Sequence, residues 1–165
     1  MDDFNYALDR VIGGLEKKNK LISPKEKQII AYHEAGHAIC GWFLPYASPL
    51  VKVTIVPRGI GTLGYAQYLP KEEYITRTEA LLDRMCMTFG GRAAEKIIFG
   101  KISTGAQSDL DQVTKMAYSM ISVYGMNDKV GNVSYYEMMK NNQFAKPYSE
   151  AKSIEEEKLG QLVQP

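Results

Sequence analysis

Both histidines of this chain lie within the decapeptide AYHEAGHAIC at residues 31–40. His33 and His37 are four residues apart, and Glu34 directly follows the first of them. On a helix, residues four apart project from the same face, so both imidazoles can bind one zinc ion with bonds of about 2.0–2.1 Å. Glu34 would lie beside that ion, where its carboxylate can take a proton from the water that the ion activates. The spacing therefore predicts a hydrolytic zinc site.

The alternative interpretation is a core helix that carries two histidines by chance. Ala35, Gly36 and Ala38 are small, and they allow such a helix to pack closely against its neighbours. However, burying two imidazoles and a carboxylate is costly unless each of them finds a polar partner. A bound metal ion would serve all three groups at once, so the sequence favours the metal site.

The third protein ligand is not apparent from the histidines, because a catalytic zinc ion usually takes three protein ligands and the chain has no further His. Asp109 is favoured because it falls in the first turn of a predicted helix, where the helix dipole stabilises an ionised carboxylate. Asp111 would point about 160–200° around that helix from Asp109. The residues alone leave five candidates open: Cys40, Cys86, Glu95, Asp109 and Asp111.

The helix that must carry the HExxH residues has a clear start. Ser23 can cap it, Pro24 suits its first position, and Glu26 completes a capping box. Pro45 ends it. Its residues are apolar almost all round, which predicts a helix buried on most sides.

The remaining elements are predicted from hydrophobic period and turn signals. Alternating residues predict strands at 51–56 and 63–69, joined by a turn at 57–62. A capping box at TRTE, residues 76–79, predicts a helix that ends at Gly100. A clean amphipathic stripe predicts another helix over 103–125.

The C-terminal part is more polar. It reads as loop after about residue 126, and a last helix is expected from Ser149 to Pro165. The predicted fold class is therefore mainly α: an array of helices with a small two-stranded β-ribbon and HExxH on a buried helix.

Composition narrows the classes of function. The chain of 165 residues carries 20 Lys and Arg against 19 Asp and Glu, a net charge of +1 that argues against a nucleic-acid partner. Cys40 and Cys86 lie in apolar, helix-like runs and are expected to be buried free thiols. With no signal peptide pattern and no apolar run of membrane-spanning length, the fragment is expected to be soluble.

Several motifs together resemble the peptidase domain of the FtsH family, the membrane-bound ATP-dependent zinc proteases that include the mitochondrial AAA proteases. They are AYHEAGHA, PRG, LGYAQYLP, LLDRMCMTFGGRAAEKIIFG and STGAQSDL, and the resemblance covers about residues 4–150. It implies one zinc ion per chain, held by His33, His37 and Asp109, with Glu34 as the catalytic residue. Glu95 matches a family glutamate that is not assigned as a ligand.

The resemblance also implies a place for the substrate. In the family, the strand that matches LGYAQY lies beside the active-site helix, and an extended substrate could add to its edge. The expected substrate-binding residues are Gly64, Tyr65, Ala66 and Gln67. The alternative is a plain ribbon whose edge binds nothing.

The expected domain organisation follows from the same resemblance. Residues 1–20 look like the junction that follows an AAA ATPase module, and residues 21–165 like the zinc peptidase domain, with a C-terminal helix shorter than the family's. No GxxxxGK[ST] phosphate loop occurs in the sequence, so ATP is expected to be used by the full-length protein but not bound by this chain.

For the full-length protein, the resemblance implies a homo-hexamer that degrades unfolded or membrane proteins and does not bind nucleic acid. Its expected location is the bacterial inner membrane with the peptidase domain cytoplasmic. The alternative is the mitochondrial inner membrane with that domain on the matrix side.

Two other functions are alternatives to this one. A metal-dependent deformylase also carries HExxH but takes a Cys ligand from a loop motif, and neither cysteine lies in one. A non-catalytic helical scaffold with structural zinc is the alternative from a different class. Glu34 argues against it, because a structural site needs no base there.

Overall fold

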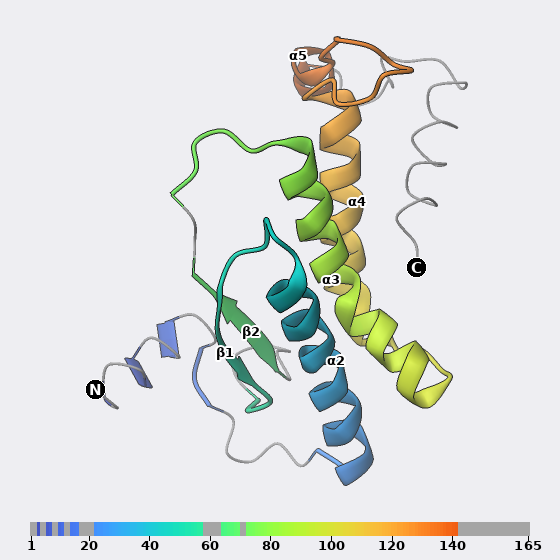
Figure 1. The fold of residues 1–165 in the computed structure, drawn as a ribbon. Helices are drawn as coiled ribbons and strands as arrows, with labels where there is room; N and C mark the ends of the chain where they lie inside the picture. The colour runs from blue at the N-terminus through green and yellow to red at the C-terminus, as the bar shows by residue number, and fades with distance from the viewer. Residues whose placement is uncertain are drawn as a thin grey trace.

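A computed structural model of the chain describes residues 22–57, 64–69 and 72–141, together with isolated positions before residue 17. It is a helical array with one small antiparallel ribbon (Figure 1), and the predicted fold class is confirmed. In chain order the elements are α2 (Pro24–Phe43), β1 (Leu50–Thr54), β2 (Tyr65–Tyr68), α3 (Thr78–Phe99), the 3-10 turn η1 (Thr104–Ala106), α4 (Gln107–Ser122) and α5 (Tyr136–Asn141).

Helix α2 begins and ends as the sequence predicts. The Ser23 hydroxyl accepts a hydrogen bond from the Glu26 N–H at 3.2 Å, and the Glu26 carboxylate accepts one from the Ser23 N–H at 3.1 Å. This reciprocal pair is the capping box. At the other end, Leu44 is extended, as the residue before Pro45 should be.

Helices α2 and α3 pack closely where two glycines meet. A β-carbon on Gly90 would lie 2.5 Å from the Gly36 carbonyl oxygen, so the two backbones are in direct contact there. Early residues of α2 meet late residues of α3, since His33 contacts Gly91 while Gly41 contacts Met87. The two helices are therefore antiparallel and cross at Gly36 and Gly90.

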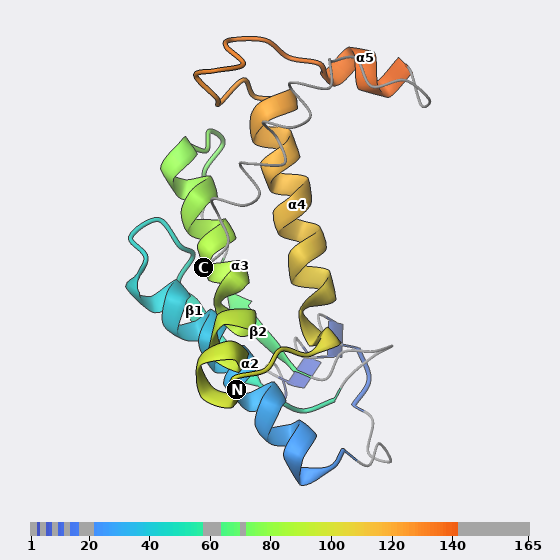
Figure 2. The same cartoon turned by 90° about the vertical axis from the view of Figure 1, so that its right-hand side faces the viewer.

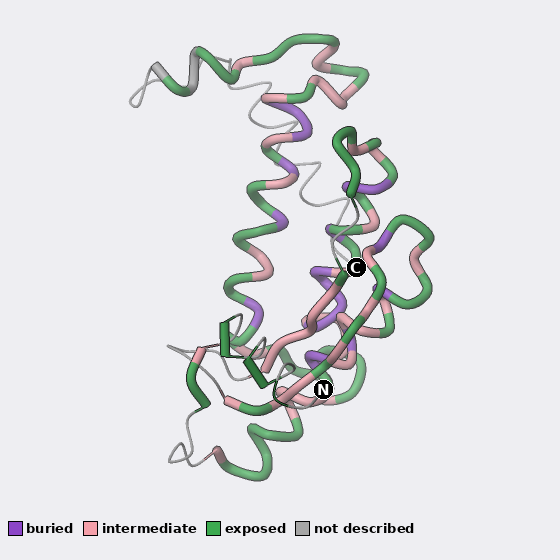
Figure 3. Tube along the Cα trace, turned by 90° about the vertical axis from the view of Figure 1, so that its left-hand side faces the viewer, coloured by how far each residue is buried: buried purple, intermediate pink, exposed green. Residues whose placement is uncertain are grey.

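The hydrophobic core lies between α3 and α4, which run side by side (Figure 2). Buried positions recur along one side of α4 (Figure 3). The core residues are Leu81, Met85 and Phe89 of α3 with Val113, Ala117 and Met120 of α4. Because α3 contacts α2 as well as α4, it places the start of α4 near the HExxH helix.

Strands β1 and β2 form a two-stranded antiparallel sheet that contacts α2. Thr54 pairs with Tyr65 and Val53 with Ala66, and the register shifts between Leu50 and Lys52. Gly64 leads into β2 directly beside the HExxH helix, because a β-carbon on Gly64 would lie 3.0 Å from the Glu34 carboxylate.

One expectation about α2 is wrong. Its HExxH face is buried, but Ile39, Trp42 and Phe43 are 59%, 74% and 79% exposed. Among the described elements, α2 contacts α3 on one side and the ribbon on another, and no further helix covers its outer face. Apolar composition alone could not reveal which side would be covered.

Three further details differ from the sequence prediction. The expected capping box at residues 76–79 does not form, because Arg77 is the N-cap of α3 and its side chain makes no capping hydrogen bond. The helix expected over 103–125 starts with η1, since Ser103 accepts the Gly105 N–H and tightens the first turn, and its α-helical part ends at Ser122. Helix α5 forms where a loop was expected, in a segment of good helix formers, YEMMK.

Other predictions fall outside the described residues. They are most of the junction over 1–20, most of the turn at 57–62 and the helix expected from Ser149. Within the described part of the chain, none of the helices combines the length and the apolar character that crossing a bilayer requires.

Candidate metal centre

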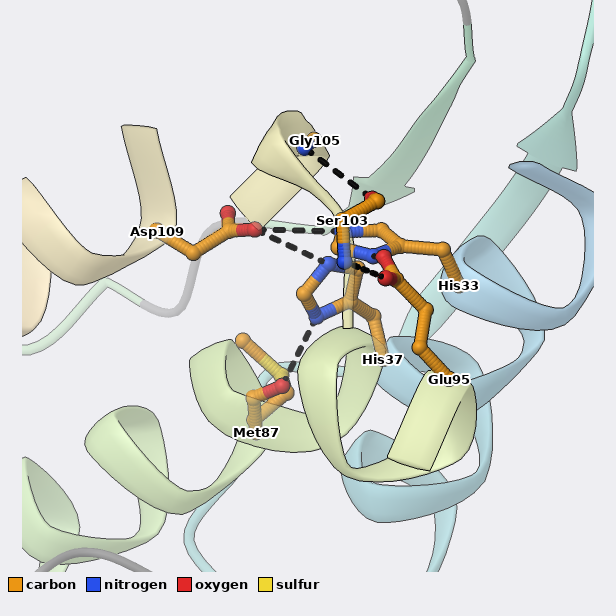
Figure 4. A network of polar contacts seen from close by, with 7 residues as sticks. All are labelled: His33, His37, Met87, Glu95, Ser103, Gly105 and Asp109. Carbon is orange, nitrogen blue, oxygen red and sulfur yellow. Dashed lines mark hydrogen bonds and ion pairs between the residues drawn. The ribbon is translucent and has the colours of Figure 1, made fainter. Parts of the chain in front are cut away.

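Helices α2 and α4 bring three potential metal ligands together (Figure 4). Asp109, in the first turn of α4, places its Oδ2 atom 3.1 Å from His33 Nε2 and 3.6 Å from His37 Nε2. One ligand atom from each of the three residues lies within 4.8 Å of the other two. All three side chains are mostly buried, with 10–17% of each exposed.

The other ring nitrogen of each histidine is already engaged. His33 Nδ1 lies 2.7 Å from Glu95 Oε1, and His37 Nδ1 lies 2.9 Å from the Met87 carbonyl oxygen. A carboxylate and a carbonyl can only accept here, so each Nδ1 carries the proton and donates it. In the neutral tautomers, both Nε2 lone pairs therefore face the Asp109 carboxylate.

Three acceptors that converge without a donor repel one another unless positive charge lies between them. Two imidazole nitrogens and one carboxylate are the ligand types of a catalytic zinc site, with a fourth position left for water or substrate. Two ligand atoms of a tetrahedral zinc ion with bonds of about 2.0–2.1 Å lie about 3.3 Å apart. The observed separations of 3.1 and 3.6 Å lie on either side of that value. The residues present fit zinc.

The electrostatics of these groups agree with that requirement. Burial lowers the pKa of His33, but the hydrogen bonds to Asp109 and Glu95 together raise it by more, so the pKa lies above its usual value. Burial lowers the pKa of His37 as well, and Asp109 and the Met87 carbonyl raise it in the same way. Burial raises the pKa of Asp109, yet the two histidines bring it well below its usual range. All three shifts favour a positive charge at the point where these side chains meet.

Glu34 lies at the edge of this cluster, with 8% of the residue exposed. Burial raises the pKa of its carboxyl group, the two histidines oppose that shift, and Asp109 adds to it. A carboxylate with a raised pKa holds a proton more readily at neutral pH, which suits a group that accepts and returns protons.

The cluster opens into a cavity of about 1200 Å³. Glu34 and both histidines line it, as do Gly64, Tyr65, Ala66 and Tyr68 around β2. The Tyr68 hydroxyl is buried without a hydrogen-bond partner, and burial together with the Glu34 and Cys40 charges raises its pKa to about 12. Gln67, the fourth predicted strand residue, pairs with Lys52 and does not line the cavity.

Of the five candidates for the third ligand, the structure brings only Asp109 to the Nε2 atoms of the two histidines. Asp111 is exposed and pairs with Lys115 at 2.6 Å. Neither Cys40 nor Cys86 belongs to the cluster. Glu95 contacts His33 from the opposite side of the ring, at Nδ1.

The sequence left Glu95 only as an open candidate for the third ligand and did not predict its contact with His33. Glu95 is 2% exposed, and its second carboxylate oxygen accepts the Ser103 N–H at 2.7 Å. Through these two bonds Glu95 fixes the orientation of the His33 ring and anchors the segment that leads to Asp109. The only available signal was a lone carboxylate within the apolar run AAEKIIF.

The sequence of this chain is similar to those of known zinc metalloproteases. The sequence model of Peptidase family M41 matches residues 20–164. The chain is 60% identical over 162 residues to the ATP-dependent zinc metalloprotease FtsH of Rhodothermus marinus, which covers 95% of this chain and 23% of that protein.

Two eukaryotic relatives are nearly as similar. They are the mitochondrial ATP-dependent zinc metalloprotease FTSH 3 of Arabidopsis thaliana and the mitochondrial inner membrane m-AAA protease component AFG3L2 of Mus musculus. Each is 58% identical over 149 residues, which is 90% of this chain and 18% of the relative. The chain thus spans about a fifth of the length of the relatives it matches.

Proposed function

This chain belongs to Peptidase family M41, and on that premise we propose that it is the peptidase domain of a membrane-anchored, ATP-dependent protease that degrades unfolded or membrane proteins. It is a zinc metalloendopeptidase by family and by the names of its relatives. The observation that carries the proposal is the convergence of His33, His37 and Asp109 beside Glu34.

We assign His33, His37 and Asp109 as the ligands of one zinc ion per chain. When bound, zinc supplies a Lewis acid that activates water and polarises the peptide carbonyl. Glu95 and the Met87 carbonyl hold the two rings with Nε2 directed inward. Such second partners fix the tautomer and the ring orientation of a metal-binding histidine.

Glu34 is the general base in this proposal. Its carboxylate accepts a proton from the attacking water and returns it to the nitrogen of the departing amine. The raised pKa of Glu34 supports both steps, because it lets the same oxygen hold the proton between them.

The substrate is proposed to bind as an extended strand along β2. Within the described residues β2 pairs only with β1, and the cavity lies beside Gly64, Tyr65 and Ala66. Main-chain hydrogen bonds to a strand edge tolerate many side chains, which suits a protease with broad substrates. Gln67 would lie further along the same strand.

For the whole protein we propose a homo-hexamer in which an ATPase module unfolds substrates and passes them to this domain. Residues 1–20 would be the junction with that module, and residues 21–165 the peptidase domain. We propose the bacterial inner membrane as its location, with the mitochondrial inner membrane as the alternative, which is the location that the name of AFG3L2 gives for that protein.

The decisive experiment replaces Glu34 with Gln. Zinc content should stay at one per chain, while cleavage of casein should fall by about 10²–10⁴-fold, the usual share of a general base. Elemental analysis and a casein digestion measure the two quantities. Glu73→Gln, at an exposed site, is the matched control. Normal cleavage by Glu34→Gln would show that the assigned role is wrong.

A further inference from the structure

The two cysteines take no part in the metal centre, yet they face each other across the α2–α3 crossing. They are the only cysteines in the chain, and both are free thiols. Cys86 is exposed, which corrects the expectation of two buried thiols, and Cys40 is half-buried. The structure thus holds an accessible thiol on one helix and a shielded thiol on the other.

Helix geometry explains why the thiols meet. The two helices are antiparallel and in backbone contact at Gly36 and Gly90. Cys40 lies four residues after Gly36, and Cys86 lies four residues before Gly90, so both occupy the next turn on the same side of the crossing.

Direct contacts agree with this placement. A β-carbon on Gly90 would lie 3.0 Å from the Cys40 sulfur, so the Cys40 thiol lies against α3, the helix that carries Cys86. Burial raises the pKa of the Cys40 thiol, and Cys86 adds to the shift. Cys40 therefore stays protonated where the exposed Cys86 can meet an oxidant first.

We propose that Cys40 and Cys86 are a site of reversible disulfide formation by peroxides, with Cys86 as the attacking thiol and Cys40 as the resolving thiol. The inference is independent of the proposed function, because it uses no residue of the metal centre. It predicts that oxidation covalently joins the helix that carries both histidines to the helix that carries Glu95.

The reaction balances with hydrogen peroxide as the oxidant. The Cys86 thiolate attacks one peroxide oxygen, the O–O bond breaks and hydroxide leaves, which gives a sulfenic acid. The Cys40 thiol then loses its proton as its sulfur attacks the Cys86 sulfur, the S–O bond breaks and a second hydroxide leaves. The two thiol protons convert both hydroxides to water, while the sulfurs lose two electrons and the peroxide gains them.

The bond would stabilise the arrangement already present. The two cysteines lie on the same side of the crossing, so the disulfide would hold α2 and α3 in the arrangement that they already have. A cross-link that closes a long loop of chain removes freedom mainly from the unfolded state. We therefore expect oxidation to raise the Tm of the zinc-loaded chain by about 5 °C or more.

The test treats the zinc-loaded chain with a small excess of hydrogen peroxide, blocks the remaining thiols with iodoacetamide after denaturation, and measures intact mass. We expect a monomer that has lost two hydrogen atoms, takes up no iodoacetamide and returns to the starting mass with dithiothreitol. The Tm of the oxidised and reduced forms is measured in parallel by differential scanning calorimetry.

Single-cysteine variants check the order of the steps. Cys40→Ser should stop at a sulfenic acid on Cys86, which dimedone traps, whereas Cys86→Ser should keep Cys40 open to iodoacetamide. A wild-type chain that over-oxidises at Cys86 while Cys40 still takes up iodoacetamide would overturn the proposal. A disulfide between two copies on a non-reducing gel, or a lower Tm after oxidation, would do the same.

Discussion

Asp109 and Asp111 lie two positions apart in α4, but their surroundings differ completely. Asp109 faces the Nε2 atoms of both histidines, whereas Asp111 pairs with Lys115 at the surface. A rotation of about 200° between the two positions explains the difference. Asp109 can therefore be tested as a metal ligand, and a variant at Asp111 is the matched control.

We expect Asp109→Asn to weaken zinc binding severely, because the amide keeps the shape but loses the negative charge and one acceptor. The loss should exceed the roughly 10–100-fold typical of an outer partner. Asp111→Asn should leave the affinity unchanged, since it disturbs only an exposed ion pair. Competition with a chromophoric chelator measures both. Equal affinities in the two variants would refute the ligand assignment.

In the proposed site Glu95 would act on zinc only through His33, because it contacts the Nδ1 atom of that ring and not the Nε2 atom that faces Asp109. In Glu95→Gln one of the two acceptor oxygens becomes an NH₂ group, so either His33 Nδ1 or the Ser103 N–H loses its partner. We expect zinc affinity to fall about 10–100-fold, as for other outer partners of metal-binding histidines.

The same chelator competition tests this, with Glu79→Gln on the exposed first turn of α3 as control. A Glu95→Gln chain that binds zinc as tightly as the wild type would mean that packing alone orients the His33 ring.

At the scale of elements, the distance between α2 and α3 is set by two glycines. A β-carbon on Gly36 would collide with the Gly90 backbone and lie 2.8 Å from the Ala94 β-carbon. One on Gly41, further along the same helix, would meet only the Tyr68 ring and the Met87 side chain at 3.0 and 3.1 Å. Backbone cannot move aside cheaply, whereas a flexible methionine can.

We therefore expect Gly36→Ala to destabilise the chain by about 1–3 kcal/mol, the usual cost of overpacking. Gly41→Ala should cost much less. Both variants gain the same helix propensity, about 1 kcal/mol. The difference between their free energies of unfolding therefore measures the cost of the added methyl group at the helix crossing. Urea unfolding at one zinc concentration measures it. Equal stability of the two variants would show that the helices can separate freely.

At the scale of the whole molecule, the chain contains the candidate metal centre and the strand β2 but no GxxxxGK[ST] phosphate loop. A strand edge can pair only with an extended segment, which a folded protein does not offer. The peptidase step should therefore work on unfolded chains without help.

We expect this chain to cleave casein at a rate that ATP does not change, and to leave a tightly folded protein almost intact. A chelator should abolish the cleavage, and added zinc should restore it. Fluorescence release from labelled substrates, with and without ATP, measures each rate. Stimulation by ATP, or equal cleavage of folded and unfolded substrates, would contradict the expectation.

Local features of this protein were predictable from its sequence. The four-residue spacing of His33 and His37, the cap at Ser23 and the place of Asp109 in a first helical turn all depend on neighbours within one turn. Alternating residues predicted the two strands, end signals predicted α2 and α3, and an amphipathic stripe predicted α4. Each of these depends on the backbone geometry of a short segment, which the order of residues specifies directly.

Only the tertiary structure decided which distant groups meet. It brings Asp109 to the histidines, places Glu95 behind His33 and leaves Trp42 exposed. These outcomes depend on how α2, α3 and α4 pack, and that packing is set by contacts between residues far apart in the chain. A helical period shows which face of a helix is apolar, and a place in the first turn shows that a carboxylate is stabilised as an anion. Neither shows which residue lies opposite, because that residue belongs to another helix.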